Sequence, residues 1–398
     1  MRSPTSGLLL LLALWALPAF AYAENELTSL LNERLSHMRA VAAYKWIHHR
    51  PIEDREREAQ VLDAAELAGL RHRLRRESTR AFFVAQIEAA KDIQRYWFDR
   101  WAVGGAPTSA PDLSAELRPE LLRLGDAIVG ALAEVSASQS IAIETEGVTA
   151  ASALALQRAA RGVRLYLSAF DQILDAAVLR VGTTGDYAPF SQRIEDGYRG
   201  VDIDMAKDLA RTLGAELVLV ETSWPKLTAD LRAGRFDIAM SGVSRTLERA
   251  RYGAFSEPYH RGGKTPLARC SDRATFSSLN SIDRPGVRVI VNPGGTNERF
   301  VNEHITAAEI VRHPDNVTIF EELAAGRADV MITDAIEARF VSQRFDALCD
   351  AMPGRQLTYQ DKGYLMPHDP RLLAYVNLWL AQRSRDGVLE GLFKQHLE

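Results

Sequence analysis

Two carboxylates follow one short apolar run in the C-terminal part of the chain. The stretch ADVMITDAIEAR, residues 328–339, begins as a strand at 330–332 and then presents Asp334 and Glu337 three residues apart. One acid at the end of a buried strand can hold the amine of a ligand. Two acids in a desolvated cleft keep one proton between them, which raises the pKa of the donor and suits general acid catalysis. The stretch therefore indicates either a binding site or a catalytic one.

A second informative group lies on a helical pattern near the N-terminus. Residues Asn25 to His49 place apolar side chains at helical spacing. Arg34 lies seven residues after Leu27, and Lys45 lies eleven residues after Arg34, about three turns at ~3.6 residues per turn. Both cations fall on the buried stripe, where they need partners. Either they bind an anionic ligand, or Arg34 pairs with a structural acid and Lys45 extends to the helix end.

The segment from Ser78 to Trp101 shows a similar pattern. Its apolar stripe contains Gln94 near the middle, and Gln86 lies at the edge of the stripe. Taken alone, a buried glutamine is usually a structural hydrogen-bonding residue. Together, two cations and an amide directed into one helical core predict a dry polar pocket for a small dianion.

These two groups lie in regions with different sequence patterns. The chain of 398 residues is long enough for two or three domains. Residues 24 to about 176 show helical periodicity, with a proline-containing loop at 104–114 and a last helix expected at 149–176. From Val178 onward, short apolar runs alternate with helical segments. We therefore expect an all-α helical domain followed by an α/β domain with mostly parallel strands.

The N-terminal sequence is typical of an export signal. Arg2 precedes the apolar run LLLLLALWALPAF, and the small-residue pattern AYA follows at 21–23. The run is too short for a comfortable membrane span. We expect cleavage after Ala23 and a soluble exported protein with no membrane contact after the signal is removed. The net charge of −4 predicts no affinity for nucleic acid.

The chain has two cysteines, Cys270 and Cys349. Two cysteines in an exported chain predict one disulfide, with two buried free thiols as the alternative. Closing so long a loop would stabilise the fold by about 4–5 kcal/mol in the chain-entropy model. No metal site is expected at His48 and His49, because adjacent helical residues point about 100° apart and no third ligand is evident.

The helical half resembles a known family. The sequences AAYKW, PIED and AQIEAAKDIQ are similar to the exported, all-helical chorismate mutases over about residues 25–135, within a domain expected at 24–165. The resemblance implies conversion of chorismate to prephenate, a unimolecular rearrangement that needs positioning and charge stabilisation but no nucleophile. It assigns Lys45 and Gln94 to the ether oxygen whose bond breaks. The residues that it implies for substrate binding are Arg34, Arg57, Gln60 and Arg118.

The second half resembles the two-lobed periplasmic amino-acid-binding proteins over nearly all of residues 178–398, in a domain expected at 171–398. The resemblance rests on LRVGTTGDYAPFS, SGVSRTLERA and NPGGTN. It implies a cleft that holds carboxylates through hydroxyls, backbone N–H groups and one arginine, whose forked guanidinium suits them. Asp334 matches the residue that holds the ammonium group of a ligand. The other implied cleft residues are Asp186, Tyr187, Trp224, Ser241, Gly242, Ser244, Arg249, Lys264, Thr296 and Asn297, with Tyr187 and Trp224 as apolar walls.

Within that fold, several segments resemble the cyclohexadienyl dehydratases: GGKTP, the Cys270 that follows it, NPGGTNERF, HPDNVTIF and MITDAIEAR. These exported enzymes convert prephenate to phenylpyruvate, and many also convert arogenate to phenylalanine. The resemblance implies that Glu337 is the general acid that protonates the leaving ring hydroxyl. Glu298 is the competing candidate, and a surface position for Glu337 at a helix start is the remaining alternative.

The two halves together predict an exported, periplasmic enzyme for two consecutive reactions, from chorismate to prephenate and from prephenate to phenylpyruvate. The expected partners are these small molecules and arogenate, with no cofactor and no metal, and a homo-oligomer is left open. The rival interpretation is a periplasmic amino-acid-binding receptor with a helical accessory domain. A third alternative is that one domain has lost its activity, and this alternative applies more to the mutase half than to the dehydratase half.

Overall fold

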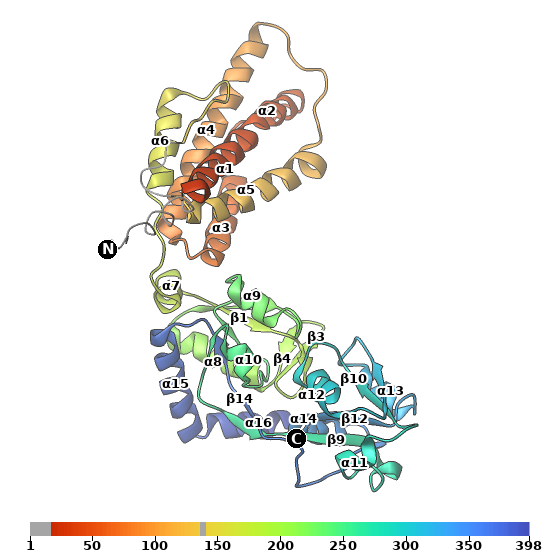
Figure 1. Cartoon of the computed structure of the whole chain (residues 1–398). Helices are drawn as coiled ribbons and strands as arrows, with labels where there is room; N and C mark the ends of the chain where they lie inside the picture. The colour runs from red at the N-terminus through yellow and green to blue at the C-terminus, as the bar shows by residue number, and fades with distance from the viewer. Residues whose placement is uncertain (1–16, 136–140, 398) are drawn as a thin grey trace, which may run out of the picture. The chain divides into compact units, whose positions relative to one another are not determined.

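The structure is a computed structural model that describes residues 17–135 and 141–397 (Figure 1). It divides the chain into two compact units, Met1–Tyr166 and Leu167–Glu398, and each expected domain falls inside one of them. Residues 1–16 of the predicted export signal lie outside the described part, as do the side chains around the expected cleavage site at Ala23. In the part of the chain that is described, no helix is long and apolar enough to cross a membrane.

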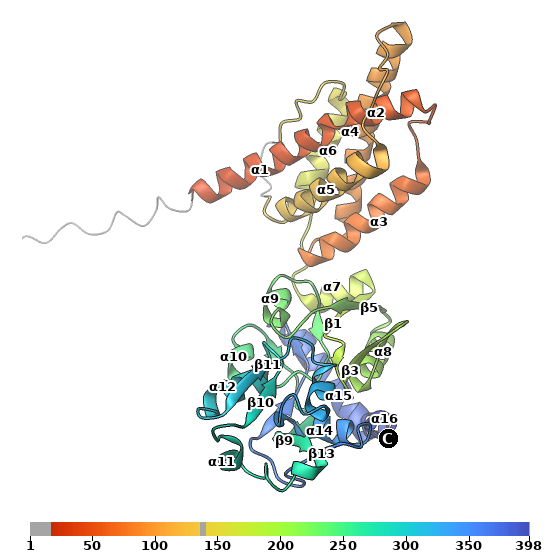
Figure 2. The same ribbon diagram turned by 90° about the vertical axis from the view of Figure 1, so that its right-hand side faces the viewer.

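The first unit is helical (Figures 1 and 2). Its elements are α1 (Leu17–Ser36), α2 (Met38–Ile47), α3 (Arg55–Arg71), α4 (Arg76–Val103), the short π-helix η1 (Leu113–Leu117), α5 (Arg118–Ala133) and α6 (Ala150–Arg161). The long helix α4 contacts α2, α3 and α6, and α5 contacts α1 and α3. Leu31, Phe82, Ile93 and Ile128 belong to the apolar core that these contacts bury. Burial of this core is the main term that stabilises the bundle.

The segment predicted as one helix from Asn25 to His49 is two helices, because the chain breaks at His37 between α1 and α2. At the break, the Ser36 hydroxyl donates to the carbonyl oxygen of Glu33 at 2.7 Å. Such local bonds compete with the backbone ladder of a helix. The prediction of one continuous helix was therefore wrong at this point.

The helix predicted at 149–176 is also interrupted. α6 ends at Arg161 with Gly162 as its C-cap, and a loop follows in which Leu165 forms a β-bridge with Leu74. A new helix, α7 (Ala169–Ala176), then begins in the second unit, where the Ser168 hydroxyl accepts from the backbone N–H of Asp171 at 3.0 Å. One run of helical periodicity thus spans the boundary between the two units.

The second unit is two-lobed and alternates strands with helices. Its first lobe contains β1 (Val178–Thr183), β2 (Asp186–Tyr187), β3 (Ser191–Ile194), β4 (Gly197–Arg199), α8 (Val201–Leu213), β5 (Glu216–Glu221), α9 (Leu227–Arg232), β6 (Ile238–Ala239), α10 (Leu247–Ala250) and β7 (Ala254–Phe255). After β8 (His260–Gly262), the second lobe contains β9 (Lys264–Arg269), the 3-10 helix η2 (Cys270–Asp272), α11 (Leu279–Ile282), β10 (Arg288–Val291), α12 (Thr296–His304), β11 (Glu309–Arg312), α13 (Ile319–Ala324), β12 (Val330–Asp334), α14 (Ala335–Ser342) and β13 (Leu348–Asp350). The chain then returns through β14 (Gln360–Lys362) to β15 (Leu365–Met366), α15 (Pro370–Arg385) and α16 (Val388–Leu397).

Each lobe is built on a five-stranded sheet. The strand orders are β5-β1-β6-β15-β7 and β11-β10-β12-β9-β13. β1 pairs in parallel with β5 and β6, and β10 pairs in parallel with β11 and β12. The remaining strands are antiparallel, so the sheets are mixed rather than mostly parallel. The reason is topological: β9 and β15 enter their sheets directly after the chain has crossed from one lobe to the other. The predicted two-lobed α/β fold is confirmed.

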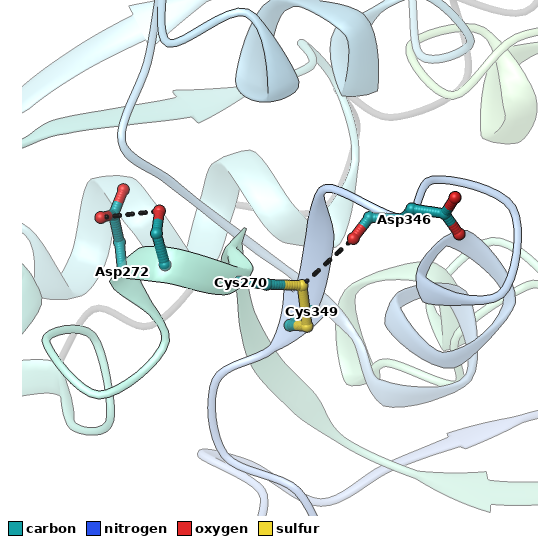
Figure 3. The surroundings of a disulfide bond; sticks show 5 residues. Cys270, Asp272, Asp346 and Cys349 are labelled. Atoms are coloured by element: carbon teal, nitrogen blue, oxygen red, sulfur yellow. Dashed lines mark hydrogen bonds between the residues drawn. A yellow bond between two sulfur atoms is a disulfide. The ribbon is translucent and has the colours of Figure 1, made fainter.

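The crossings place two lysines in the cleft between the lobes. β8 and β14 carry the chain across and pair with each other in antiparallel fashion. Lys264 begins β9 just after the first crossing, and Lys362 ends β14 at the second. In the second lobe, Cys270 and Cys349 form a disulfide with a Cα–Cα distance of 4.9 Å (Figure 3).

Candidate active sites

The helical unit contains a cavity of about 290 Å³. Residues from α1 to α5 line it, and most of its wall is apolar. The six residues that the sequence predicted for this site all line this one cavity: Arg34, Lys45, Arg57, Gln60, Gln94 and Arg118. Residues up to 84 positions apart in the chain are therefore brought to the same pocket.

Arg34 and Lys45 are two of the cations that line this cavity. The Nε of Arg34 is buried without a hydrogen-bond partner, and burial lowers the pKa of its guanidinium to about 10. Lys45 donates from Nζ to the carbonyl oxygen of Ile52 at 2.6 Å, and burial also lowers the pKa of its amine. Neither cation makes an ion pair within the described residues, so the structural acid proposed as the partner of Arg34 is not there. An anionic ligand would supply the missing charge.

The other predicted side chains of this cavity are held by local contacts. Arg57 lies in the first turn of α3, where its backbone N–H bonds to Asp54, and its Nη1 donates to Gln60 at 3.0 Å. Arg118 donates to the hydroxyl of Ser114 at 3.1 Å. The Nε2 of Gln94 donates to the carbonyl oxygen of Ala90 in the same helix, and the buried Oε1 of Gln94 has no partner among the described residues.

Two lining residues were missed by the sequence analysis or not given a role. Lys91 pairs with Glu58 at 3.0 Å and with Glu88 at 2.8 Å, which keeps one further cation at the wall. Gln86, noted only at the edge of the stripe, is buried and lines the cavity. A charged residue next to Ala90 on an otherwise apolar stripe was the available signal for Lys91.

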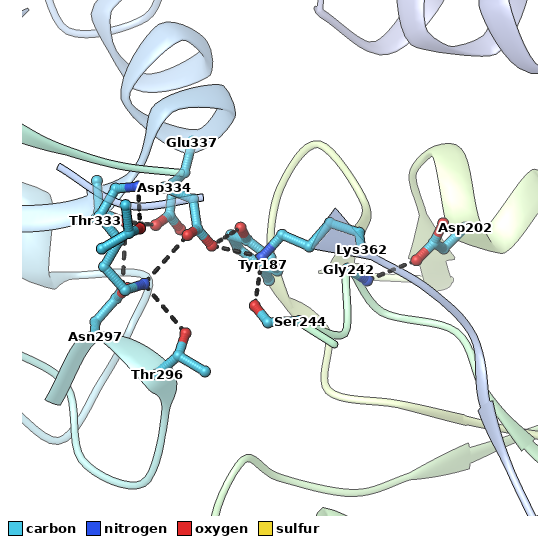
Figure 4. A network of polar contacts seen from close by, with 12 residues as sticks. Tyr187, Asp202, Gly242, Ser244, Thr296, Asn297, Thr333, Asp334, Glu337 and Lys362 are labelled. Atoms are coloured by element: carbon cyan, nitrogen blue, oxygen red, sulfur yellow. Dashed lines mark hydrogen bonds and ion pairs between the residues drawn. The ribbon is translucent and has the colours of Figure 1, made fainter. Parts of the chain in front are cut away.

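The second unit has its candidate site in the cleft between the lobes (Figure 4). The cavity there measures about 30 Å³, room for one or two water molecules. The predicted residues that line it are Tyr187, Trp224, Gly242, Ser244, Arg249, Thr296, Asn297, Asp334 and Glu337.

Asp334 is the centre of the polar network in the cleft. Lys264 Nζ lies 3.2 Å from one of its oxygens and Lys362 Nζ lies 2.6 Å from the other, while the Tyr187 hydroxyl also donates to it. Burial opposes ionisation of this carboxyl, but the two lysines outweigh burial and hold its pKa well below the usual range. Asp334 is thus ionised and already paired with two ammonium groups of the protein itself.

Glu337 differs from Asp334 in its surroundings. It is buried on α14, where it accepts a hydrogen bond from the Thr333 hydroxyl. Burial is the main cause that raises the pKa of Glu337 to about 8, and the negative charge of Asp334 adds to it. The prediction that the two acids keep one proton between them, with a raised pKa for the donor, agrees with these directions, although burial contributes more than the charge of Asp334. The surface position for Glu337 is excluded, and a neutral carboxylic acid is what the cleft contains near neutral pH.

Glu298, the competing candidate, has a different role. Its carboxylate accepts from the backbone N–H of Gly294 at 2.8 Å and from Arg312 at 2.9 Å. These contacts lower the pKa of Glu298, and the side chain does not line the cavity. An ionised carboxylate engaged in this way cannot donate a proton, so the geometry favours Glu337.

The anion-binding residues are arranged differently from the expectation. Arg249 lines the cleft, donates to the carbonyl oxygen of Ser244 at 3.1 Å, and has a pKa lowered to about 10 by burial. The N–H of Gly242, expected to face a carboxylate, instead donates to Asp202 at 2.6 Å. Its φ of 66° and the 2.5 Å that would separate a Cβ from the Tyr187 ring require glycine here.

Three predicted residues lie behind the cavity wall rather than on it. The Ser241 hydroxyl accepts from the N–H of Thr184 at 3.1 Å and is part of the scaffold. Asp186 is partly buried, and this burial raises the pKa of its carboxyl. Lys264 reaches the network from behind, donating to Asn297 at 2.5 Å and to Thr296 at 3.1 Å. Of these three residues, Lys264 is the one that donates to Asp334.

Lys362 was missed by the sequence analysis. It is buried, lines the cavity and joins Asp334 to the Ser244 hydroxyl, to which it donates at 2.9 Å. Asn292 and Asn316 were missed too, although both line the cavity. The available sequence signal for Lys362 was a lysine shortly before the buried strand β15.

Comparison with known proteins agrees with this division. Residues 179–398 match the family of bacterial extracellular solute-binding proteins, family 3, and residues 23–95 match chorismate mutase type II. The chain therefore belongs to the bacterial extracellular solute-binding proteins of family 3, with a type II chorismate mutase region preceding that domain. The resemblances to both families seen in the sequence are confirmed.

Among the relatives, cyclohexadienyl dehydratase of Pseudomonas aeruginosa is 50% identical over 252 residues, which covers 63% of this chain and 94% of that protein. The L-cystine-binding protein TcyJ of Escherichia coli is 29% identical over 225 residues, covering 56% of this chain and 83% of that protein. The crystal structure of the ancestral amino acid-binding protein AncCDT-1, a precursor of cyclohexadienyl dehydratase, covers 58% of this chain and all of its own, at 36% identity and a TM-score of 0.54.

Proposed function

We propose that the chain is a bifunctional enzyme, an isomerase in its helical unit and a carbon–oxygen lyase in its two-lobed unit. The first converts chorismate to prephenate, and the second converts prephenate to phenylpyruvate. The same lyase site would take arogenate to phenylalanine. The rearrangement forms the substrate of the dehydration, so the matched mutase family and the dehydratase relative correspond to consecutive steps.

In the helical cavity, the residues act by positioning and by charge. Arg34, Arg57 and Arg118 bind the two carboxylates of chorismate and hold its reactive conformer, in which the carbon atoms that will bond lie close together. Lys45 and Gln94 donate hydrogen bonds to the ether oxygen. Negative charge grows on that oxygen as its carbon–oxygen bond breaks, so these donors stabilise the transition state more than the substrate. No proton needs to be transferred.

In the cleft, Glu337 donates its proton to the ring hydroxyl of prephenate. The carbon–oxygen bond breaks and water leaves, while the bond from the ring to its carboxylate breaks and releases carbon dioxide. The electron pair of that bond completes the aromatic ring. Arg249 binds the carboxylate of the side chain that stays in the product.

The buried protonated acid is the observation that carries this assignment. Glu337 has a pKa of about 8 in a cleft that also holds Lys264, Lys362 and Arg249. A carboxylic acid that is neutral near pH 7 can donate a proton, whereas its neighbour Asp334 stays ionised. This pairing of one neutral and one ionised carboxyl supports catalysis rather than retention of a ligand.

The receptor interpretation has less support. An amino-acid receptor of this fold would use Asp334 to hold the ammonium group of its ligand. Here two lysines of the protein occupy both oxygens of that carboxylate, so a ligand's ammonium group would have to displace one of them.

The test is to supply the purified protein with chorismate and follow chorismate and phenylpyruvate by absorbance. Loss of chorismate with appearance of phenylpyruvate is expected. Accumulation of prephenate would contradict the lyase assignment, and turnover of prephenate alone would contradict the mutase assignment. Binding without any turnover would support the receptor.

We further propose that the protein acts in the periplasm after cleavage behind Ala23. The supporting observations are the charged, apolar and small-residue pattern of residues 2–23 and membership of an extracellular family. N-terminal sequencing of the protein recovered from the periplasm tests this, with Glu24 expected as the first residue.

A further inference from the structure

Gln86 is a buried side chain with no partner at either end of its amide. It is 1% exposed, and both its Nε2 and its Oε1 lack a hydrogen-bond partner. Among the described residues, it is the only one with two such atoms. It lies on α4 and lines the cavity of the helical unit.

An unpaired buried amide is costly to the fold. An unsatisfied buried polar group destabilises the fold, and a leucine at this position would fill similar space without that cost. The neighbouring wall shows that apolar residues suit this site, since Phe83, Ile87 and Ala90 of the same helix also line the cavity. The amide is therefore explained by a ligand that supplies its partner.

The other orphaned atoms in this unit indicate what kind of ligand that is. Within the described part of this unit they are Nε of Arg34 and Oε1 of Gln94, and both residues line the same cavity as Gln86. Arg34 forms no ion pair with an acid of residues 17–135 and 141–397, so a ligand group beside it is expected to be an anion. A carboxylate can accept from a guanidinium and from an amide at the same time, because it offers two oxygens.

The helix fixes which end of the ligand Gln86 reaches. Gln86 and Gln94 are eight residues apart on α4, which corresponds to about 12 Å along the axis and about 80° around it. Gln94 and Lys45 serve the ether oxygen in the proposed mechanism, so Gln86 lies toward the far end of the substrate. A carboxylate group of the dianion, rather than the breaking bond, is what can meet it there.

We propose that Gln86 is a substrate-binding residue of the mutase, whose Nε2 donates a hydrogen bond to the substrate carboxylate held by Arg34. This assignment rests on the proposed function of the helical unit. It makes Gln86 a determinant of specificity for a carboxylate-bearing substrate, without adding a further charge to the cavity.

Two variants test the assignment. Gln86→Leu removes the donor and keeps the approximate size, and kcat/KM for chorismate should fall by about 10-fold or more, mostly through KM. Gln86→Glu places a carboxylate against the substrate carboxylate, and its kcat/KM should fall further than that of Gln86→Leu. Turnover of prephenate by the second unit of the same protein should stay unchanged in both variants.

Thermal unfolding separates a binding role from a structural one. Because Gln86→Leu removes an unsatisfied buried amide, the Tm of the ligand-free helical unit should stay the same or rise. A lower Tm would mean that the amide supports the fold and would overturn the proposal, as would wild-type kcat/KM in Gln86→Leu. A smaller loss in Gln86→Glu than in Gln86→Leu would overturn the carboxylate as the bound group. If the wild-type protein itself leaves chorismate unaltered, the proposed function fails instead.

Discussion

Glu337→Gln tests the proton donor of the cleft directly. The amide keeps the size of the side chain and can still accept from the Thr333 hydroxyl, but it cannot deliver a proton to the leaving oxygen. Turnover of prephenate should fall by about 10²-fold or more, the usual scale for a positioned acid. Binding should persist, because Arg249 and the lysines around Asp334 are unchanged.

The same change should alter stability in a direction that the pKa fixes. The pKa of Glu337 is about 8 in the folded protein against an ordinary 4.5, because burial opposes its charge. Folding thus favours the protonated form, so its contribution to stability is complete below pH 4.5 and is lost as the pH rises through about 8. At about 1.4 kcal/mol per pH unit, this interval corresponds to about 5 kcal/mol. Wild type should lose stability of that order, and Glu337→Gln should not.

The assay combines rates with unfolding. The kcat/KM of wild type on prephenate should fall as the pH rises through about 8, because only the protonated acid donates. In urea unfolding, the stability advantage of the variant over wild type should be larger at about pH 9 than at about pH 5. Glu298→Gln is the matched control and should keep its activity. Normal turnover by Glu337→Gln, or a loss confined to Glu298→Gln, would refute the reasoning.

Three further predictions concern other parts of the chain. Arg34→Ala and Lys45→Ala should each lower chorismate turnover by about 10²-fold or more with prephenate turnover intact, and normal steady-state rates on chorismate would contradict their roles. A protein beginning at Leu167 should be soluble and dehydrate prephenate alone, because the second unit has cores of its own; an insoluble product from every nearby start, with the full chain active, would argue against this. Replacing Cys270 and Cys349 with serine should lower the free energy of unfolding of the second unit by about 4–5 kcal/mol in urea titrations, because the disulfide joins residues 79 positions apart and restricts the unfolded chain. Unchanged stability would contradict this loop-closure contribution.

The sequence pattern predicted the class of each unit but not every boundary. Helical and strand periodicities reflect which faces are buried, so they distinguished the all-α part from the α/β part. They did not reveal the break at His37 or the loop after Gly162, because the side chains on both sides of each interruption continue to face a core. Those interruptions depend on local hydrogen bonds, such as the one from Ser36, which spacing does not encode.

For the sites, residues on one regular element were easier to predict than residues joined by topology. Arg34 and Gln94 were found because a polar residue on an apolar stripe is visible in the sequence. Lys362 was not, because it reaches Asp334 only through the second crossing between the lobes, 28 residues further along the chain. The ionised state of Asp334 depends on that lysine and on Lys264, whereas the raised pKa of Glu337 depends mainly on burial, so neither followed from the spacing of the two acids alone.

The contacts across the cleft hold the two lobes in a closed conformation. Tyr187 and Lys362 hold Asp334, the Asn316 amide donates to the carbonyl oxygen of Asp186 at 2.8 Å, and the space left inside is about 30 Å³. A six-membered ring with two carboxylates does not fit that space, so the lobes must part before substrate enters and again before product leaves. The rate at which the lobes open to release product therefore sets an upper limit on kcat, however fast the proton transfer is. Trp224, packed edge-on against Tyr187 at this junction, would report each opening through its fluorescence.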